Sequence, residues 1–319
     1  MKVLGVSLAA IVLGFGLSAS ADTIRADRAQ SAYLGLGEQA EYASVGRLDI
    51  AAANGIYIGS GTLIAPDWVL TAGHCVDQAS ELRFTVAGTA HVANGWVANP
   101  GWTGNLSAGT DIALVHLATP VTGVTPAARY TGTSELGRTA TYVGYGMTGT
   151  GLTGATTFDG LKRGAQNVLD SYLQTGRKSV NSNILLADFD NPKKKGDSSL
   201  GSNSALDLEG LIAPGDSGGG AFITIGGQTF LAGVNSFGQA RDGRVDSDYG
   251  DISGDTRVSA FNAWIDSVLK SVMFGAVLPG DSTSDGVTKV ATYMDAVPEP
   301  ASMTLLALGG LFLLRRRAK

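Results

Sequence analysis

Cysteine is almost absent from this chain of 319 residues, which contains only Cys75. A single thiol excludes an intramolecular disulfide and a zinc site built from several cysteines. Charged residues are also scarce at 16%, whereas hydrophobic residues make up 44%. That composition can bury a core in one large domain or two small ones. The net charge of -5 argues against nucleic acid as a partner, since nucleic-acid binding requires a basic surface.

Long apolar runs occur only near the two ends of the chain. At the first end, Lys2 precedes an apolar stretch over residues 3–17, and small residues follow at Ala19-Ser20-Ala21. This order is typical of an export signal over residues 1–21 that is cleaved after Ala21. An uncleaved N-terminal anchor is the alternative.

The second apolar run lies in residues 298–319. Pro298-Glu299-Pro300 come first, then a mostly apolar run over 301–314, then three arginines. The run is shorter than the ~18–20 residues of a confident membrane span, and arginines favour the cytoplasmic side. The segment resembles the PEP-CTERM sorting signal of Gram-negative bacteria, which exosortase-type enzymes process. The resemblance implies an extracellular or cell-surface protein whose last segment enters the inner membrane transiently. A simple tail anchor is the alternative.

Short apolar segments with glycine-rich turns between them fill the middle of the chain. They lie at 56–58, 62–64, 68–70, 82–86, 112–117, 140–143, 221–225 and 230–234. Segments of this length and spacing predict an all-β barrel or sandwich. Phe261, Trp264, Ile265, Val268 and Leu269 have the i, i+3, i+4 spacing of one C-terminal amphipathic helix.

Composition divides the rest of the chain. Residues 22–44 are polar and alanine-rich, and are either a short pro-segment or a lead into the first strand. Residues 45–275 contain the strand-like segments and form the expected domain. Residues 188–210 are a long polar loop within it. Residues 276–297 are rich in Gly, Ser, Thr and Asp, and we expect a linker there.

Three short motifs carry residues suited to nucleophilic catalysis. They are Thr71-Ala72-Gly73-His74-Cys75, Asp111-Ile112-Ala113-Leu114 and Gly215-Asp216-Ser217-Gly218-Gly219. A serine hydroxyl is a weak nucleophile and needs a base within hydrogen-bond reach. A neutral histidine can take its proton and later return it to the leaving amine, while a carboxylate orients the ring. The motifs therefore predict Ser217 as nucleophile, His74 as base and Asp111 as the orienting group.

With these motifs, in the order His, Asp, Ser, the chain resembles the chymotrypsin/trypsin family of serine proteases over about residues 45–272. The segments 59–75 and 235–238, and Thr256-Arg257-Val258-Ser259 before a Trp-containing helix, carry the resemblance. It implies an all-β fold of two packed six-stranded antiparallel barrels with a C-terminal helix. The implied activity is that of a secreted serine endopeptidase, which cuts protein or peptide substrates through an acyl-enzyme.

The resemblance also assigns roles near the nucleophile. The backbone N–H groups of Gly215 and Ser217 would form the oxyanion hole. Leu211 would lie at the base of the substrate pocket, with Ser236, Phe237 and Gly238 along its wall. Because Leu211 offers no carboxylate to a buried cation, we expect an enzyme that is not Arg/Lys-specific. No cofactor or metal is implied.

Two departures from the family pattern bear on the site. Since no cysteine occurs near Gly59, Cys75 has lost its usual partner, and we expect a buried free thiol beside His74. In related enzymes the residue matching Asp216 can pair with an N-terminus freed by proteolysis. The nearest candidate here is Val45-Gly46, which follows no basic residue, and this argues against activation by that route.

Two other functions use the same residues. A non-catalytic surface binding module could keep the fold, although the presence of all three catalytic residue types argues against it. An esterase could use the same triad. Labelling of Ser217 by a fluorophosphonate tests the first alternative, and peptide against ester turnover tests the second.

Overall fold

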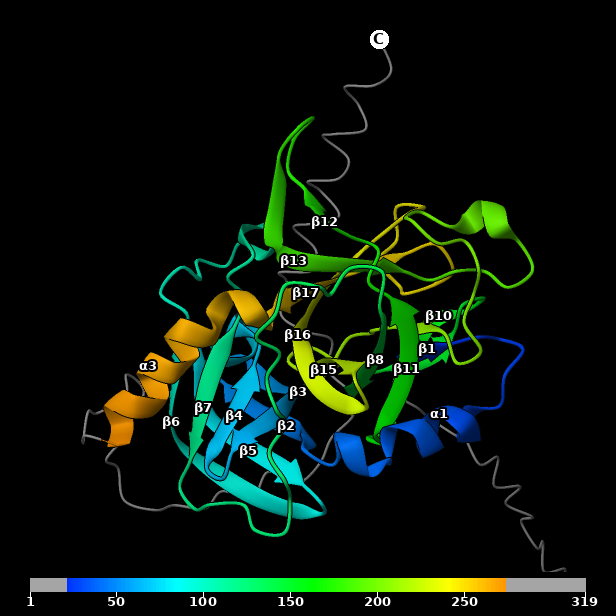
Figure 1. Ribbon diagram of the computed structural model, residues 1–319. Coiled ribbons are helices and arrows are strands. Elements are labelled where there is room, and N and C mark those ends of the chain that lie inside the picture. The colour runs from blue at the N-terminus through cyan, green and yellow to red at the C-terminus, as the bar shows by residue number, and fades with distance from the viewer. Residues whose placement is uncertain (1–21, 274–319) are drawn as a thin grey trace, which may run out of the picture.

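The first half of the protein is a closed six-stranded barrel, seen in a computed structural model that describes residues 22–273 (Figure 1). Its strands follow the order β2-β3-β4-β7-β6-β5. They are β2 (Val45–Ala52), β3 (Gly55–Ala65), β4 (Trp68–Thr71), β5 (Ala79–Val86), β6 (Thr89–Ala98) and β7 (Ala113–Leu117). Leu48, Leu63, Leu70, Phe84 and Leu114 are fully buried in its core. Closure pairs every edge of these strands, so the barrel offers no edge for association.

The second half is a strongly curled antiparallel sheet of seven strands in the order β11-β8-β15-β16-β17-β13-β12. They are β8 (Thr139–Gly144), β11 (Arg163–Val168), β12 (Ser171–Gln174), β13 (Val180–Asp188), β15 (Gly220–Ile225), β16 (Gln228–Gln239) and β17 (Ile252–Arg257). Asn167 bridges the curl, because its side-chain amide donates to the carbonyls of Asp188 (2.8 Å) and Gly210 (3.0 Å). The predicted all-β fold is confirmed. Strands β11 and β13 are not paired through their backbones in this sheet, and the Asn167 side chain connects them instead.

A small four-stranded sheet contains the first described residues. Its order is β10-β9-β1-β14, with β1 (Asp22–Ile24), β9 (Thr148–Thr150), β10 (Gly154–Thr157) and β14 (Gly210–Leu211). Helix α1 (Gln30–Gly37) and the turn η1 (Ala40–Tyr42) then lead to the barrel. Gly37 lies so close to β11 that a Cβ there would be 2.5 Å from the Arg163 carbonyl carbon. Residues 22–44 therefore pack on the domain, and whether they are a pro-segment or a lead into the first strand stays a prediction.

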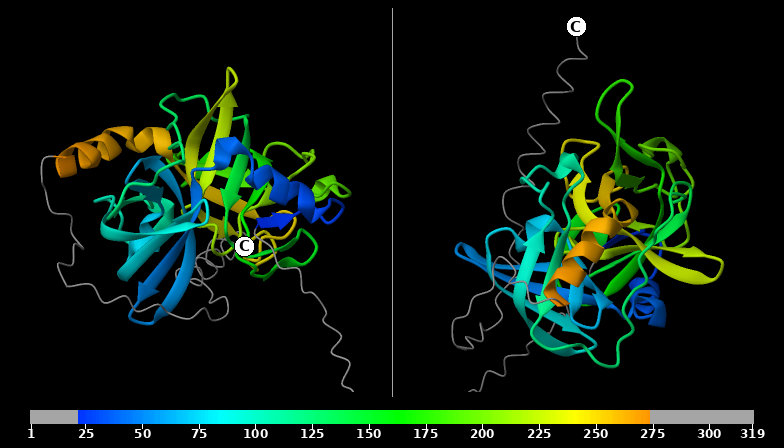
Figure 2. Two further views of the ribbon diagram at one scale, coloured as in Figure 1. Left: turned by 90° about the horizontal axis from the view of Figure 1, so that it is seen from below. Right: turned by 60° about the vertical axis from the view of Figure 1, so that its left-hand side comes forward.

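The predicted C-terminal helix is present as a short turn, η4 (Val258–Phe261), followed by α3 (Asn262–Met273). The helix leaves the second half and lies along the barrel, as Figures 1 and 2 show. Its apolar face buries Ile265 completely and Phe261 almost completely in the barrel's core cluster. Arg129 fixes the first turn by donating to Asn262 (2.7 Å) and Asp266 (2.6 Å).

The remaining elements are short: α2 (Gly73–Val76), η2 (Leu106–Ala108) and η3 (Lys195–Asp197). The polar stretch 188–210 is, as predicted, mostly loop. No helix within residues 22–273 has both the length and the apolar character needed to cross a bilayer. The predicted export signal, linker and sorting segment lie outside the described residues.

Candidate active site

His74 lies in the single turn α2, directly after strand β4 of the barrel. Its ring nitrogen Nδ1 is 2.8 Å from Oδ2 of Asp111, and its backbone N–H donates to Oδ1 of the same carboxylate at 2.8 Å. An ionised carboxylate only accepts hydrogen bonds, so Nδ1 carries a proton, and Nε2 has the lone pair whenever the ring is neutral. Asp111 therefore fixes both the position and the tautomer of His74.

Asp111 is fully buried just before β7 and is held by both halves of the protein. Besides the two bonds to His74, its Oδ2 accepts from the Ser236 hydroxyl on β16 at 2.5 Å. The Thr256 hydroxyl on β17 donates to the backbone carbonyl of Asp111 at 2.8 Å. Sequence reasoning missed both contacts, because only the register of β16 against β17 shows which side chains face the barrel.

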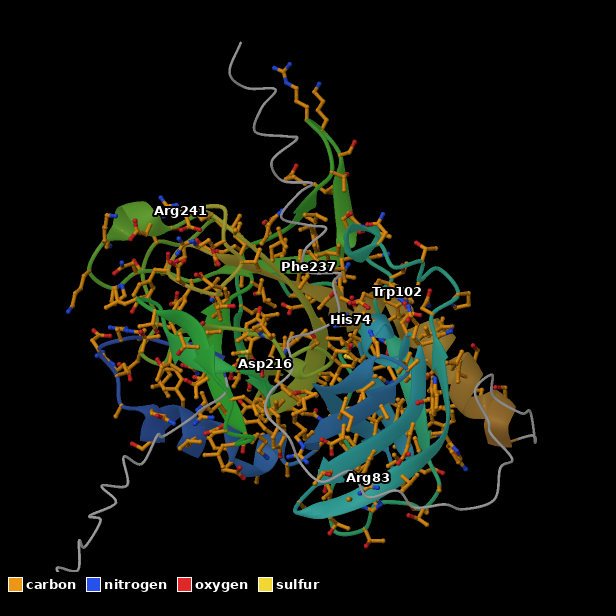
Figure 3. All side chains as sticks on the ribbon, turned by 180° about the vertical axis from the view of Figure 1, so that it is seen from behind. His74, Arg83, Trp102, Asp216, Phe237 and Arg241 are labelled. Atoms are coloured by element: carbon orange, nitrogen blue, oxygen red, sulfur yellow. The ribbon has the colours of Figure 1, made fainter. Side chains whose placement is uncertain are left out.

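The His74 ring lies in a tight, largely buried setting. The Trp102 ring lies beside it, with centroids 6.4 Å apart and the planes tilted by 50°, and Figure 3 labels the two residues next to each other. Gly73 leaves room for this, since a Cβ there would be 3.0 Å from the Trp102 ring and 3.1 Å from Asp111 Oδ1. Burial acts to lower the pKa of His74, but the charge of Asp111 holds this pKa well above its ordinary value.

Ser217 lies in a glycine turn that packs on the barrel. Gly215 (φ +95°) and Gly218 (φ +83°) adopt the left-handed conformation that glycine tolerates without strain. A Cβ on Gly218 would be 2.0 Å from the Thr71 hydroxyl and 2.3 Å from the Ser60 carbonyl. The turn can therefore lie directly against β3 and β4, the strands that lead to His74.

The backbone of Ser217 is tied to the residue after His74. Its carbonyl accepts a hydrogen bond from the Ser60 N–H at 2.8 Å and from the Cys75 thiol at 3.5 Å. Cys75 is buried and free, as predicted. Ser217 itself is 6% exposed. The three residues predicted for catalysis thus converge at the junction between the barrel and the curled sheet.

Asp216 is fully buried behind the Ser217 turn. Its carboxylate accepts from the Gly146 N–H (2.8 Å) and the Ala213 N–H (2.9 Å). Burial raises the pKa of Asp216 to about 6, although the neighbouring Asp22 and these backbone donors act to lower it. The sequence argued against activation through a new N-terminus at Val45, the candidate considered there for pairing with Asp216. Val45 pairs with Thr62 inside β2, and the carboxyl beside Asp216 belongs to Asp22.

The residues predicted for substrate binding lie on β14 and β16. Leu211 is 1% exposed and lies opposite Thr23. On β16, the Ser236 side chain is turned to Asp111, and Phe237 is buried against Gly254, where a Cβ would be 2.3 Å from the ring. A Cβ on Gly238 would be 2.9 Å from Val245. Their contact with substrate remains a prediction.

One group of three carboxylates in residues 22–273 has the spacing to hold a cation: Asp246, Asp248 and Asp251, with one oxygen each within 4.8 Å of the others. Asp251 already accepts backbone N–H bonds from Arg241 (2.9 Å) and Ser247 (3.0 Å). Burial, and then neighbouring acids, raise the pKa of Asp248 to about 6. The group fastens its own loop and shares no residue with the triad site.

Two family models match the sequence. The model described as Trypsin matches residues 37–265, and the model described as PEP-CTERM protein-sorting motif matches residues 296–318. The first match covers most of the chain and includes all three motifs. The second match covers the predicted sorting segment.

Similar proteins agree with the first match. Chymotrypsin-like elastase family member 1 of Felis catus is 30% identical over 233 residues, covering 66% of this chain and 78% of the relative. The protein of the same name from Canis lupus familiaris is 31% identical, covering 66% and 81%. A solved structure described as HL collagenase has a TM-score of 0.54 at 18% identity, covering 75% of this chain and 96% of that one. That likeness shows the fold alone.

Proposed function

The chain belongs to the trypsin family of serine endopeptidases, and from that premise we propose that Ser217, His74 and Asp111 are its catalytic triad. The observation that carries the proposal is the pair of hydrogen bonds between Asp111 and His74. One involves the backbone N–H of His74 and the other its ring nitrogen Nδ1, each at 2.8 Å. The Cys75 thiol, one residue along, contacts the carbonyl of Ser217. The expected base, His74, and the backbone of the expected nucleophile, Ser217, are therefore connected through the neighbouring residue Cys75.

The geometry supports acyl transfer in two halves. The Oγ of Ser217 bonds to the substrate carbonyl carbon while Nε2 of His74 takes the hydroxyl proton. Asp111 stabilises the imidazolium that forms. The tetrahedral intermediate then collapses, the C–N bond breaks, and His74 gives its proton to the leaving amine. Water repeats the sequence on the acyl-enzyme, and this frees the acid and restores Ser217.

The backbone N–H groups of Gly215 and Ser217 supply the oxyanion hole in this proposal. The Ser60 hydroxyl donates to the Gly215 carbonyl at 3.0 Å and so holds the peptide between the two proposed donors, Gly215 and Ser217. Gly215 is also in the left-handed region, where a side chain would strain the turn. One such donor is typically worth about 3–4 kcal/mol in the transition state.

The matched sorting motif indicates export through a sorting system of Gram-negative bacteria. Beyond that, we propose that residues 1–21 are the export signal and that an exosortase-type enzyme processes residues 298–319. The mature enzyme would then act at the cell surface or outside the cell.

For the residue before the cut, we propose an apolar or medium-sized side chain. Leu211 is apolar and buried, and offers no carboxylate to a cationic side chain. The names of the relatives, which are elastases, agree with a preference other than Arg or Lys.

Fluorophosphonate labelling of the processed protein tests the triad. We expect labelling in the wild type and none in Ser217→Ala. Ser44→Ala is the matched control, since Ser44 is a buried serine just before β2 whose hydroxyl has no hydrogen-bond partner among the described residues. A folded, processed wild type that resists the probe would refute the proposal and favour a binding module. Turnover of esters without peptides would indicate an esterase.

A further inference from the structure

Asn235 is a fully buried residue of strand β16 whose side-chain amide contacts the turn that carries Ser217. Its Nδ2 donates to the backbone carbonyl of Asp216 at 3.2 Å, and its Oδ1 has no hydrogen-bond partner among residues 22–273. The nitrogen is the atom that faces this carbonyl, because a carbonyl oxygen accepts hydrogen bonds and needs a donor. A buried acceptor without a partner lowers stability, so the amide needs a reason other than stability.

The carbonyl that Asn235 contacts belongs to the same peptide unit as the N–H of Ser217. This unit is trans, and the C=O and N–H of a trans peptide lie in one plane and point in opposite directions. A donor that fixes the direction of the Asp216 carbonyl therefore also fixes the direction of the Ser217 N–H. That N–H is one of the two proposed oxyanion donors.

Two donors from different elements hold the Asp216 carbonyl. The Gly219 N–H donates to it across the turn at 2.8 Å, and the Asn235 amide is the second donor. One hydrogen bond tolerates a broad range of angles at the carbonyl, whereas two from different directions restrict its tilt. A Cβ on Gly219 would be 3.0 Å from Asn235 Nδ2 and 2.9 Å from the Asp216 carbonyl oxygen, so glycine leaves room for the amide.

The backbone of β16 places Asn235 against the turn. The Asn235 N–H donates to the Gly219 carbonyl at 3.0 Å, and the Gly218 N–H donates to the Asn235 carbonyl at 2.8 Å. The register of β16 against β17 shifts at this point and makes Ser236 the extra residue of a bulge. Consecutive side chains therefore contact different groups: Ser236 donates to Asp111, and Asn235 donates to the turn.

The other proposed donor, the Gly215 N–H, is oriented by a backbone group. Its peptide unit contains the Pro214 carbonyl, which accepts a hydrogen bond from the Met147 N–H at 2.6 Å. That contact depends on the path of the loop and not on one side chain. The direction of the Ser217 N–H, in contrast, depends in part on a side chain that a single substitution removes.

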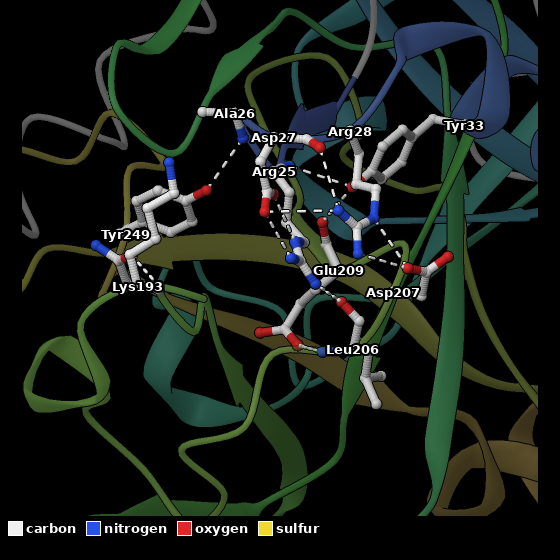
Figure 4. A network of polar contacts seen from close by, with 11 residues as sticks. Arg25, Ala26, Asp27, Arg28, Tyr33, Lys193, Leu206, Asp207, Glu209 and Tyr249 are labelled. Carbon is white, nitrogen blue, oxygen red and sulfur yellow. Dashed lines mark hydrogen bonds and ion pairs between the residues drawn. The ribbon is translucent and has the colours of Figure 1, made fainter.

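The chain that leads into the turn is held by a separate network (Figure 4). The Arg25 guanidinium donates to the Leu206 carbonyl at 2.6 Å, and the Tyr33 hydroxyl donates to the Glu209 carbonyl at 2.9 Å. These contacts do not involve Asn235. Loss of its amide should therefore leave this part of the chain in place and act on the turn itself.

We propose that Asn235 is a positioning residue of the oxyanion hole, whose side-chain amide aims the Ser217 N–H at the developing oxyanion by holding the Asp216 carbonyl on the opposite side of the peptide. This inference rests on the triad and the oxyanion hole proposed above. Donors that are oriented in advance stabilise the transition state without reorganisation during the reaction. The unpaired Oδ1 is then the loss of stability that accompanies this orientation.

Asn235→Leu tests this role, because leucine has the branched shape of asparagine without its polar atoms. The variant leaves the Asp216 carbonyl with its Gly219 donor and removes the unpaired oxygen, so its melting temperature should stay level or rise. Loss of a whole oxyanion donor typically lowers kcat by about 10²- to 10³-fold. For a misdirected donor we expect acylation by saturating p-nitrophenyl acetate to slow at least about tenfold, with little change in the half-saturating concentration.

A thionoester separates the direction of the donor from general damage to the site. In p-nitrophenyl thionoacetate, sulfur replaces the carbonyl oxygen, and sulfur is a weak hydrogen-bond acceptor. Its transition state gains little from the oxyanion hole, so Asn235→Leu and the wild type should differ by less than about threefold on this substrate. A displaced Ser217 hydroxyl or His74 ring would slow both esters equally.

Asn262→Leu is the matched control, at the first turn of α3. The Asn262 Nδ2 donates to the Tyr130 carbonyl at 2.8 Å, and its Oδ1 accepts from Arg129 at 2.7 Å. Because both polar atoms of this amide are paired, Asn262→Leu should melt at a lower temperature. The folded enzyme should acylate with both esters at the wild-type rates.

Each other outcome has a defined meaning. Unchanged acylation by the oxygen ester in folded Asn235→Leu, or equal losses on the two esters, overturns the inference and leaves the triad in place. If Asn235→Leu does not fold, Asn235→Ala is measured in the same way, and failure of both to fold also overturns it, because the amide is then structural. A folded, processed wild type that neither hydrolyses the oxygen ester nor reacts with a fluorophosphonate refutes the triad instead.

Discussion

The hydrogen bond from Ser236 to Asp111 provides a sharp test of how the site is held together. Ser236 is 3% exposed, and its hydroxyl donates to Oδ2 of Asp111, the same oxygen that contacts His74 Nδ1. In Ser236→Ala the carboxylate loses this donor without any change of charge. The His74 contact then becomes the main constraint on that oxygen.

The expected size of the effect follows from the type of bond. A hydrogen bond to a charged group contributes about 1.5–3 kcal/mol. Since about 1.4 kcal/mol corresponds to a factor of ten in rate, we expect Ser236→Ala to lower kcat by roughly 10- to 100-fold. The carboxylate also becomes more basic when it loses a donor, so the pKa of His74 should rise further and the acid limb of the pH–rate profile should move to higher pH.

The assay is the pH dependence of acylation by a fluorophosphonate and of peptide turnover, with kcat and KM separated. Ser44→Ala is the control, because it removes a buried hydroxyl that has no hydrogen-bond partner within residues 22–273. A Ser236→Ala enzyme with unchanged kcat and an unchanged acid limb would refute the reasoning. A change in KM alone would instead mean that Ser236 acts on substrate binding.

Four further predictions use other contacts of the site and core. Asp111→Asn should leave the fold intact but lower kcat by about 10⁴-fold. In the wild type, activity should rise with pH through a midpoint above the ordinary histidine value of 6.5, because the raised pKa of His74 must be passed before the ring is neutral. Burial raises the pKa of Asp255 and of Glu209 to about 8. The unfolded chain releases these protons near pH 4. The stability that they contribute is therefore complete below about pH 4 and is lost as pH rises through about 8. Asp255→Asn should flatten part of this pH dependence of the free energy of unfolding, measured by denaturant titration. Gly218→Ala should destabilise the fold by at least about 2 kcal/mol, because its Cβ would be 2.0 Å from the Thr71 hydroxyl. The control Gly88→Ala is also at positive φ but has nothing within 4 Å of its Cβ, so it should cost about 1 kcal/mol or less. An equal loss of melting temperature in the two variants would contradict this reasoning.

The sequence predicted the elements that depend on local pattern. Short apolar strands, the helix that follows Val258 and the free thiol of Cys75 were all visible in it. Each of these follows from periodicity, composition or a count, so neighbours along the chain are enough to predict it.

Contacts between distant strands were not predictable in the same way. Nothing near Ser236 or Thr256 in the sequence indicates that both hydroxyls face Asp111, since this depends on how β16 and β17 lie against the barrel. Asn167 likewise looks like an ordinary polar strand residue until its amide is seen to bridge β11 and β13. Asp22, a polar residue in a polar segment, gave no sign that it would be fully buried.

Three fully buried aspartates, Asp111, Asp255 and Asp216, differ in how the fold stabilises the carboxyl group. Asp111 receives three hydrogen bonds on its side chain, so its carboxylate is solvated by the protein itself. Asp255 has one donor, the Tyr142 hydroxyl at 2.9 Å, and burial raises its pKa to about 8, so it can remain neutral at the cost of a proton. Asp216 has backbone donors, as Asp111 has donors, but the carboxyl group of Asp22 lies beside it. Hydrogen bonds therefore stabilise its charge less completely than that of Asp111.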